Sequence, residues 1–385
     1  MSIPEEFSRF PDHWDVLPFT KAVKDATSGN IKIQTSDYLE DGLIPIVDQG
    51  QLHYGGFTDD KLTICKSELP TIVFGDHTRV FKYIEEPFAL GADGAKVLEP
   101  LANLDKRFLF HYLKQLKIES AGYSRHYKFL KETYVPVPPL AEQKRIAAIL
   151  DKADAIRQKR QQAIALADQF LRSVFLDMFG DPVTNPKGWE MQPISKVAEV
   201  QGGLQVTKKR EGLPVTCPYL RVANVYRGKL DLSEVKTMQV TDAELERVSL
   251  VKDDILVVEG HGNKEEIGRC AMWDGSIESI IHQNHLIRVR VIKDRVLPQY
   301  LADFINSEGG RTQLIGASNT TSGLNTISTR LVKETEVLIP DLQTQERYVH
   351  IFNKVKEALR CFQKGTLGCT ELFESVSQKA FSGQL

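Results

Sequence analysis

The sequence has few cysteines and no long apolar run, and each absence excludes a class of protein. Its five cysteines contain no C-x-x-C pair and form no even set for a disulfide framework, so a reducing cytoplasm fits best. No stretch approaches the roughly 18 uninterrupted apolar residues of a membrane-spanning helix. The N-terminal MSIPEEFSRF lacks the basic and then apolar pattern of a signal peptide. We therefore expect a soluble cytoplasmic protein without membrane contact.

The charge of the chain is nearly balanced. It has 49 Lys and Arg against 51 Asp and Glu, a formal net charge of −2, which excludes a histone-like polycation. Nucleic-acid binding stays open, because a local basic face can be balanced elsewhere. The 385 residues, of which 42% are hydrophobic, suffice for two or three domains with packed cores.

Two blocks of the sequence occur twice, in the same order. With a shift of 202 positions, LKETYVPVPPLAEQKRI from Leu130 aligns with VKETEVLIPDLQTQERY, and the alignment runs without a gap to Phe179 and Phe381. With a shift of 175 positions, PDHWDVLPFTK from Pro11 aligns with PKGWEMQPISK from Pro186. The difference between the shifts makes the segment between the blocks 27 residues longer in the second copy. The chain therefore consists of an entry block, a variable globular part and a helix, followed by the same three parts again.

The C-terminal block of each copy has the composition of a long helix. The segment Leu140–Phe179 contains no Gly or Pro, and its apolar residues alternate at spacings of three and four, which is typical of a coiled-coil seam. The predicted seam is Ile146, Ile149, Ala153, Ile156, Ala163, Ala167, Phe170 and Val174. At ~1.5 Å per residue each rod is roughly 60 Å long. A lone rod with one apolar seam is unstable in water, so we expect this helix to pack antiparallel on its counterpart, Leu342–Phe381.

The globular parts favour a β-rich structure. Short strand-like runs, among them Leu62–Cys65 and Tyr219–Val225, are separated by Gly and Asp turns and followed by a short helix and a polar loop. We predict an α+β fold: two pseudo-repeated domains, each a mixed, β-rich globular part with short helices, separated by two long helices packed as an antiparallel coiled coil. The predicted parts are a first domain at 1–137, a central helix at 138–181, a second domain at 182–339 and a distal helix at 340–385.

Polar loops in both globular parts carry side chains that suit contact with DNA. The loop 75–79 follows an apolar strand, as 260–264 does in the second copy, and both combine Gly, His and a cation. Arg and Lys can bind guanine or phosphate, and Asn can pair with adenine. The candidates from these loops and from the strand-like run 219–225 are His77, Thr78, Arg79, Arg221, Asn224, His261, Asn263 and Lys264. For the residues of the two loops, an ordinary polar hairpin tip is an equally good interpretation. In the run 219–225, strand alternation places Arg221 and Asn224 on opposite faces, so both can share a surface only if the strand ends or bulges.

Two later loops, 121–128 and 317–330, add hydroxyl, amide and cationic groups. Their candidates are Ser124, Arg125, His126, Lys128, Thr321, Ser322, Asn325 and Arg330. Such groups suit the positioning of phosphate, and they suit a solvated loop as well.

Signatures of catalysis are weak. The chain has no GxxxxGK[ST] motif, and the Glu-x-Lys spacing of Glu234 and Lys236, although found in metal-dependent nucleases, is too short to be informative. In a strand, the spacing of His282 and His285 directs them to opposite faces. We therefore predict no catalytic residue, no metal site and no cofactor in this chain. Two alternatives stay open: a metal-dependent nuclease that uses Glu234 and Lys236, and a coiled-coil adaptor whose globular parts bind protein.

The layout resembles the specificity subunit of type I restriction–modification systems. The resemblance covers nearly the whole chain and is carried by WDVLPFTKAV and WEMQPISKVA at the domain entries, by VPPLAEQKRIAAILDKAD and IPDLQTQERYVHIFNKV at the helix entries, and by LRVANVYRGKLDL and KAFSGQL. The helix-entry motif Pro-x-Leu-x-x-Gln-x-Arg is fairly specific.

The resemblance implies a non-catalytic subunit that binds double-stranded DNA. Each globular part is then a target-recognition domain that reads one half of a split, asymmetric site, and the helix pair sets the gap between the halves. The implied partners are two modification subunits, which bind S-adenosylmethionine and methylate adenine, with motor-nuclease (restriction) subunits as optional further partners. S-adenosylmethionine is expected on the modification subunit and not on this chain.

Overall fold

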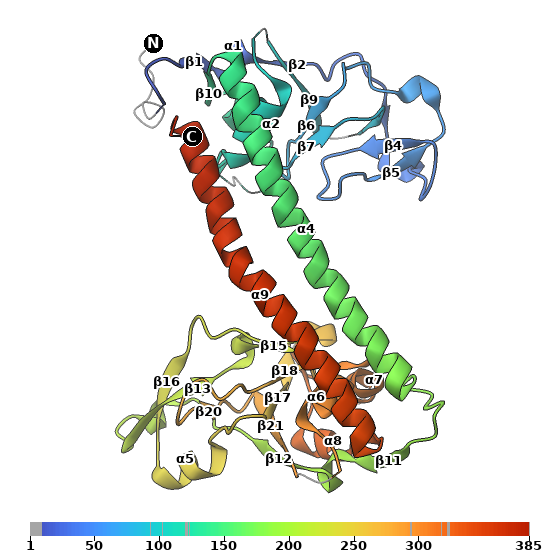
Figure 1. Cartoon of the computed structure of the whole chain (residues 1–385), viewed down its shortest axis with the longest axis vertical. Coiled ribbons are helices and arrows are strands. Elements are labelled where there is room, and N and C mark those ends of the chain that lie inside the picture. The colour runs from blue at the N-terminus through green and yellow to red at the C-terminus, as the bar shows by residue number, and fades with distance from the viewer. Residues whose placement is uncertain are drawn as a thin grey trace. The chain divides into compact units, whose positions relative to one another are not determined.

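The computed structural model describes residues 10–92, 94–101, 103–119, 122, 124–292, 295–316, 318–321 and 324–384. The chain forms two compact units (Figure 1). Unit 1 comprises Met1–Gln162 and Phe362–Leu385, and unit 2 comprises Ala163–Cys361. The two long helices, α4 (Leu140–Phe179) and α9 (Leu342–Phe381), are each shared between the units and cover the residues that the sequence predicts.

A four-stranded antiparallel sheet forms the centre of unit 1. Its strands, in order, are β2 (Val23–Asp25), β9 (Ala95–Pro100), β6 (Thr71–Gly75) and β7 (Phe81–Ile84). A second sheet, with parallel pairs at its centre, has the order β3 (Lys32–Ile33), β8 (Ala89–Gly91), β4 (Ile44–Val47) and β5 (Gly56–Thr58). Helix α2 (Lys106–Gln115) packs on the first sheet, and the short helices are α1 (Phe19–Ala22) and α3 (Tyr127–Leu130).

Unit 2 repeats the four-stranded antiparallel sheet, and its second sheet has three strands where that of unit 1 has four. Its antiparallel sheet has the order β12 (Ala198–Gly202), β21 (Leu286–Val291), β17 (Ile255–Val258) and β19 (Cys270–Met272). Its second sheet has the order β16 (Lys236–Val240), β13 (Val215–Leu220) and β20 (Ile281–His282), and β13 and β20 are parallel. Its helices are α5 (Asp242–Val248), α6 (Pro298–Asn306), which packs on β19, α7 (Glu308–Gly316) and α8 (Thr329–Glu334).

Unit 2 adds two small sheets to this common plan. One is the hairpin β14 (Val225–Tyr226) and β15 (Lys229–Leu230). The other has the order β18 (Gly260–His261), β23 (Leu324–Thr326) and β22 (Asn319–Thr321). These additions belong to the longer segment between the repeated blocks, where the sequence predicts that the two copies differ.

The repeated blocks fold alike, residue by residue. Strand β1 (Asp15–Pro18) pairs with β10 (Tyr134–Val137), and β11 (Glu190–Pro193) pairs with β24 (Glu336–Ile339). The partners Asp15 and Val137 correspond to the partners Glu190 and Ile339 under the shifts of 175 and 202 that align the sequences. The internal duplication is therefore confirmed at the level of strand register.

A buried glutamine joins each long helix to its globular part in the same way. The side chains of Gln143 in α4 and Gln345 in α9 are both fully buried. Each donates to the carbonyl of the proline five residues earlier and to a carbonyl in the loop before the short helix of its unit. Each Oε1 also accepts from the N-cap residue of that helix, from Asp105 N at 2.7 Å and from Leu297 N at 2.8 Å. These shared hydrogen bonds explain why glutamine occupies this place in both copies.

The hydrophobic core of each unit includes parts of both long helices. In unit 1 the core contains Ile146 and Leu150 of α4 and Phe381 of α9. In unit 2 the core contains Leu338 together with Phe175 and Phe179 of α4 and Tyr348 of α9.

The predicted seam of α4 is wrong at two positions. Ile156 and Phe170 are about half exposed, whereas Leu171 is buried. The buried side chains follow the i, i+4 spacing that faces a globular core. Among the described helices, none combines the length and the apolar character that crossing a membrane requires.

Two predicted strands are wrong for a local reason. The run Leu62–Cys65 begins as a 3-10 helix, Lys61–Thr63, because the Asp60 side chain accepts from Leu62 N at 2.9 Å and caps it. The run Tyr219–Val225 stops being a strand at Leu220, and a 3-10 helix follows at Val222–Asn224.

Candidate nucleic-acid interface

In unit 1 the fold brings the two predicted loops together. Asp76 follows the last residue of β6, and its main-chain oxygen accepts from His126 N at 2.8 Å. Its carboxylate accepts from Tyr127 N at 2.6 Å. The loop 76–79 and the later loop 124–128 therefore form one polar surface, fixed at its centre by the buried Asp76.

The candidates of unit 1 divide into anchors and exposed groups. His126 is buried, with its Nδ1 2.9 Å from Asp76 O, and Thr78 donates from Oγ1 to Gln49 O at 2.5 Å, so both hold the loops in place. Arg79, which lies in the left-handed region with a φ of 64°, extends an exposed side chain and donates to Ile118 O at 2.9 Å.

The remaining candidates of unit 1 lie on the same loops. Arg125 and Lys128 are exposed, and Lys128 Nζ lies 4.7 Å from the centre of the Phe129 ring. His77 and Ser124 are half-buried, and the hydroxyl of Ser124 has no hydrogen-bond partner within the described part of the chain. The three exposed cations, Arg79, Arg125 and Lys128, are thus available at this surface to a ligand, whereas the Ser124 hydroxyl is buried beneath it.

Unit 2 joins its loops at the equivalent point of the fold. Glu259 directly follows β17, the counterpart of β6, and its main-chain oxygen accepts from Ile327 N at 2.8 Å. Strand β18 pairs with β23, so that His261 lies opposite Asn325. The Asn325 amide donates to Gly262 O at 3.3 Å. The prediction that 75–79 and 260–264 are counterparts is therefore supported by topology, since both connect the third and fourth strands of the same sheet.

The candidates at the tip of 260–264 are largely exposed. His261 Nδ1 accepts from Asn263 N at 3.0 Å, and Asn263 Oδ1 accepts from Glu265 N at 3.0 Å, which shapes the turn. Lys264 is exposed at the start of a 3-10 helix, Lys264–Glu266. Both Asn263 and Lys264 are exposed, so the Asn263 amide and the Lys264 ammonium are accessible to a ligand.

The other candidates of unit 2 are more scattered. Arg330 has a side chain that is 84% exposed, but its Nε donates to Glu334 one turn further along α8. Thr321 is the last residue of β22, and Ser322 lies outside the described residues.

Arg221 and Asn224 belong to the turn that ends β13. Asn224 is only 3% exposed, and its amide donates to the main-chain oxygens of Asp231 and Glu234, at 2.8 and 2.9 Å. Its Oδ1 accepts from Arg221 N at 3.0 Å. Asn224 thus builds the loop, whereas the partly exposed Arg221 is paired with the Glu234 carboxylate.

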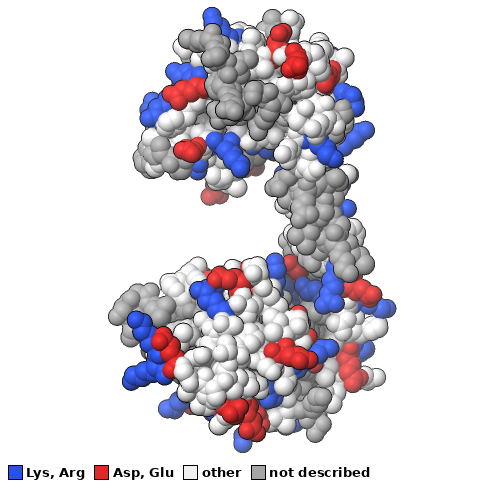
Figure 2. Space-filling view, turned by 90° about the vertical axis from the view of Figure 1, so that its left-hand side faces the viewer, with Lys and Arg blue, Asp and Glu red and all other residues white. Residues whose placement is uncertain are grey.

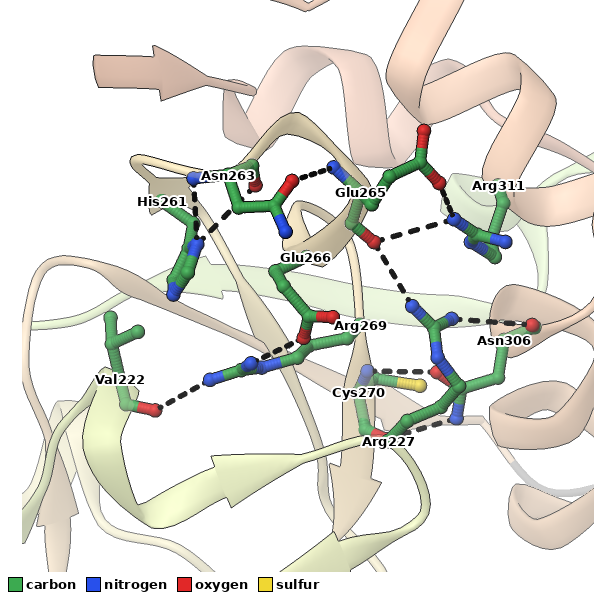
Figure 3. A network of polar contacts seen from close by, with 10 residues as sticks. All are labelled: Val222, Arg227, His261, Asn263, Glu265, Glu266, Arg269, Cys270, Asn306 and Arg311. Atoms are coloured by element: carbon green, nitrogen blue, oxygen red, sulfur yellow. Dashed lines mark hydrogen bonds and ion pairs between the residues drawn. The ribbon is translucent and has the colours of Figure 1, made fainter. Parts of the chain in front are cut away.

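A network of arginines supports the loop 260–266 (Figure 3). Arg269 pairs with Glu266, donates to Val222 O at 3.3 Å, and by its hydrogen bond lowers the pKa of the Glu266 carboxyl. Arg311 of α7 pairs with Glu265. On the face drawn in Figure 2, Lys and Arg are interspersed with Asp and Glu, so on this face affinity for an anion depends on local groups and not on a broad positive field.

Sequence reasoning missed one loop of unit 1. Residues 48–55 connect β4 to β5, and this is where Arg221 and Asn224 lie in unit 2. Gln49 holds the loop against the candidate surface, since its Oε1 lies 3.3 Å from His77 N. The tip is exposed and consists of Gln51, Leu52 and His53. Two amides and a histidine between two short strands were the signal that could have identified it.

Nothing in the described residues supports the nuclease alternative. No group of three or more His, Cys, Asp or Glu side chains that could hold a metal ion occurs among them. The Glu234 carboxylate is paired with Arg221 and lies 3.6 Å from Lys236 Nζ. His282 is fully buried between main-chain oxygens, and burial lowers its pKa to about 4.

Two copies of one fold, each with a polar surface at the same place, define a duplicated binding protein. The sequence matches the family described as "Type I restriction modification DNA specificity domain" over residues 19–166 and 186–364. It is 26% identical over 428 residues to the specificity subunit of the type I restriction enzyme EcoKI of Escherichia coli (strain K12), covering 98% of this chain and 90% of the relative. It is 24% identical over 424 residues to the StySPI specificity subunit of Salmonella potsdam, with the same coverage.

A solved structure has a similar fold. The type I restriction–modification S subunit from M. genitalium superposes with a TM-score of 0.60 at 14% identity, covering 99% of this chain and 98% of that one. The chain therefore belongs to the type I restriction–modification DNA specificity family. It is a non-catalytic DNA-recognition subunit, as the sequence predicts, and neither the nuclease nor the adaptor alternative is supported.

Proposed function

We propose that each unit reads one half of a bipartite site in double-stranded DNA, through the surface formed by its two joined loops. The observation that carries this proposal is the equivalence of Asp76 and Glu259. At the same point of the same fold, each anchors a later loop by its main-chain oxygen, while the exposed side chains around it differ. A shared frame with different exposed groups suits two readers of different half-sites.

The two long helices act in this proposal as a spacer. We infer that α4 and α9 pack as an antiparallel coiled coil and hold the two reading surfaces at a set separation. The core of each unit contains residues from both helices, which supports this inference. Half-sites about one helical turn of DNA apart, ~34 Å, require such a separation.

Two modification subunits are the proposed catalytic partners. They carry S-adenosylmethionine and methylate adenine, and motor-nuclease subunits can join them in a restriction complex in the cytoplasm. The exposed side chains of Leu166 and Phe170, one turn apart on α4 and 56% and 51% exposed, support a docking surface on the helices. No group in the described part of this chain would supply the methyl transfer itself.

Mapping of methylated adenines tests the proposal. Cells that express this chain with its modification subunits should methylate one split, asymmetric site, and the purified chain alone should methylate nothing. Exchange of the loops 76–79 and 124–128 for those of another family member should change one half-site and leave the other half-site and the spacer unaltered. Methylation of an unsplit site, or a change in both half-sites, would contradict the proposal.

A further inference from the structure

Behind the loop 260–266 of unit 2, arginines outnumber the carboxylates that face them (Figure 3). Three arginines, Arg227, Arg269 and Arg311, form what we call the arginine cluster. Arg269 is neutralised by Glu266 and Arg311 by Glu265. Arg227 has no carboxylate within 4 Å among the described residues and donates only to main-chain oxygens, to Glu265 O at 3.1 Å and Asn306 O at 3.5 Å.

The unpaired positive charge of Arg227 lies in an environment that disfavours it. Partial burial, together with the nearby Arg311, lowers the pKa of Arg227. The Nε groups of Arg269 and Arg311 are buried donors without an acceptor in the described part of the chain. Partly buried cations that repel one another destabilise the folded chain, and a bound anion would relieve this repulsion.

Glu265 makes hydrogen bonds with two members of the cluster. Its main-chain oxygen accepts from Arg227 at 3.1 Å and from Arg311 at 3.3 Å, which fixes the backbone. Its side chain pairs with Arg311 but is 68% exposed, so it can turn into solvent without disturbing the fold. The cluster is therefore accessible from the side on which this carboxylate lies.

The position of the cluster relates it to the DNA-reading loop. Glu265 directly follows Lys264 in the same 3-10 helix, and the tip with His261 and Asn263 precedes it. Arg227 approaches from the turn between β14 and β15, and Arg311 approaches from α7. A ligand that reaches the tip of the loop thus passes close to the surplus charge.

We propose that Arg227 and Arg311 form a subsite for one backbone phosphate of duplex DNA. In the DNA-free chain the Glu265 carboxylate serves as an internal counter-ion for this subsite, and the phosphate replaces it on binding. The inference rests on the proposed function and deepens it: the tip of the loop contacts bases, while the cluster sets the register of unit 2 on the DNA. Such a contact carries no sequence information.

The dependence of DNA affinity on salt tests the subsite. The full chain, purified with its modification subunits, is titrated into labelled duplexes with and without its site, at 0.05 to 0.2 M KCl. Loss of one phosphate contact in Arg227→Gln should lower the slope of log K against log salt by about 0.9. Affinity should then fall about 15-fold at 0.05 M and about 4-fold at 0.2 M salt, equally for both duplexes.

Three further variants separate this role from a structural one. Arg227→Lys keeps the charge and should restore the slope. Glu265→Gln removes the counter-ion and should raise affinity for both duplexes. Arg295→Gln is the matched control, because Arg295 lies in unit 2 and is already paired with Glu190; its slope should equal that of the wild type.

An unchanged slope in Arg227→Gln, or an equal loss in Arg295→Gln, overturns the subsite. A second experiment compares the midpoint of thermal unfolding of the wild type and of Arg227→Gln in potassium phosphate and in potassium chloride at equal ionic strength. Stabilisation by inorganic phosphate that needs Arg227, combined with an unchanged DNA slope, would identify a site for free anions and also overturn the proposal. If the wild type does not distinguish the two duplexes but Arg227→Gln still lowers the slope, the proposed function fails and the subsite stands.

Discussion

Replacement of the half-buried acid Asp303 by asparagine should stabilise unit 2 at neutral pH. Asp303 lies in α6, where its Oδ2 accepts from Tyr348 Oη at 2.8 Å and from Gln299 Nε2 at 2.8 Å. Burial between α6 and α9 raises the pKa of Asp303 to about 6, from an ordinary value of 3.8. Asparagine keeps an oxygen that can accept both bonds and removes the charge.

The size and sign of this stability change follow from the protonation of Asp303 in the folded state and in the unfolded state. Because the folded carboxyl holds its proton up to about pH 6, whereas the unfolded one releases it near 3.8, the folded state binds more protons between these values. The stability of unit 2 therefore falls as pH rises from about 4 to 6 and is constant above. At about 1.36 kcal/mol per pH unit, the ionised carboxylate costs up to about 3 kcal/mol, which Asp303→Asn should recover at pH 7.5 and not at pH 4.

Urea unfolding of the full chain measures this effect. In a Trp14→Phe background the fluorescence reports unit 2, because Trp189 and Trp273 are then the remaining tryptophans. The control is Asp177→Asn, which removes an exposed carboxylate of α4 and should leave the unfolding free energy unchanged. The reasoning is refuted if Asp303→Asn destabilises unit 2 equally at pH 4 and 7.5, or if wild type and variant share one pH dependence.

Three other perturbations have expected outcomes. Gln143→Leu and Gln345→Leu each leave a buried N–H and two carbonyls unpaired, and each should cost its own unit about 2–4 kcal/mol in urea unfolding. Alanine at both Gln51 and His53 should relax the half-site read by unit 1 in methylation maps and leave the other half unchanged. Burial lowers the pKa of His111, so the unfolded state binds its proton first. The protection factors of the α2 amides, corrected for the intrinsic exchange rate at each pH, should therefore fall as pH falls below 6.5.

Each of these outcomes has a matched control. Gln161→Leu alters an exposed glutamine of α4 and should be neutral, so an equal loss there would deny the buried glutamines a special role. Gln34→Ala removes an exposed amide of unit 1 outside the loop 48–55 and should leave the methylated site intact. His111→Gln should abolish the acid-induced change in α2, and persistence of the change in that variant would assign it to other groups.

The long helices and the duplication could be predicted because both leave signals that extend over tens of residues. Period and composition define α4, and no single tertiary contact decides whether it forms. The reading surface could not be predicted in this way. Asn224 has the chemistry of a base-reading residue, but the end of β13 at Leu220 turns its amide inward, where it binds three main-chain groups. The amides and the histidine of the loop 48–55 are only a weak local signal, and its place after β4, which relates it to Arg221 in unit 2, becomes visible only in the fold.

The bonds that join the loops explain how one fold can serve two recognition tasks. Asp76 and Glu259 hold the later loops through main-chain oxygens, which accept from the main-chain nitrogens of His126 and Ile327. A bond between main-chain atoms places few demands on the side chains beside it, so exposed residues can change while the loops stay joined. The side chains that the two units do share, above all the buried glutamines, lie at the helix joints. Substitutions in the two reading surfaces should therefore change the stability of the units little, whereas substitutions of the buried glutamines where the long helices join them should lower it.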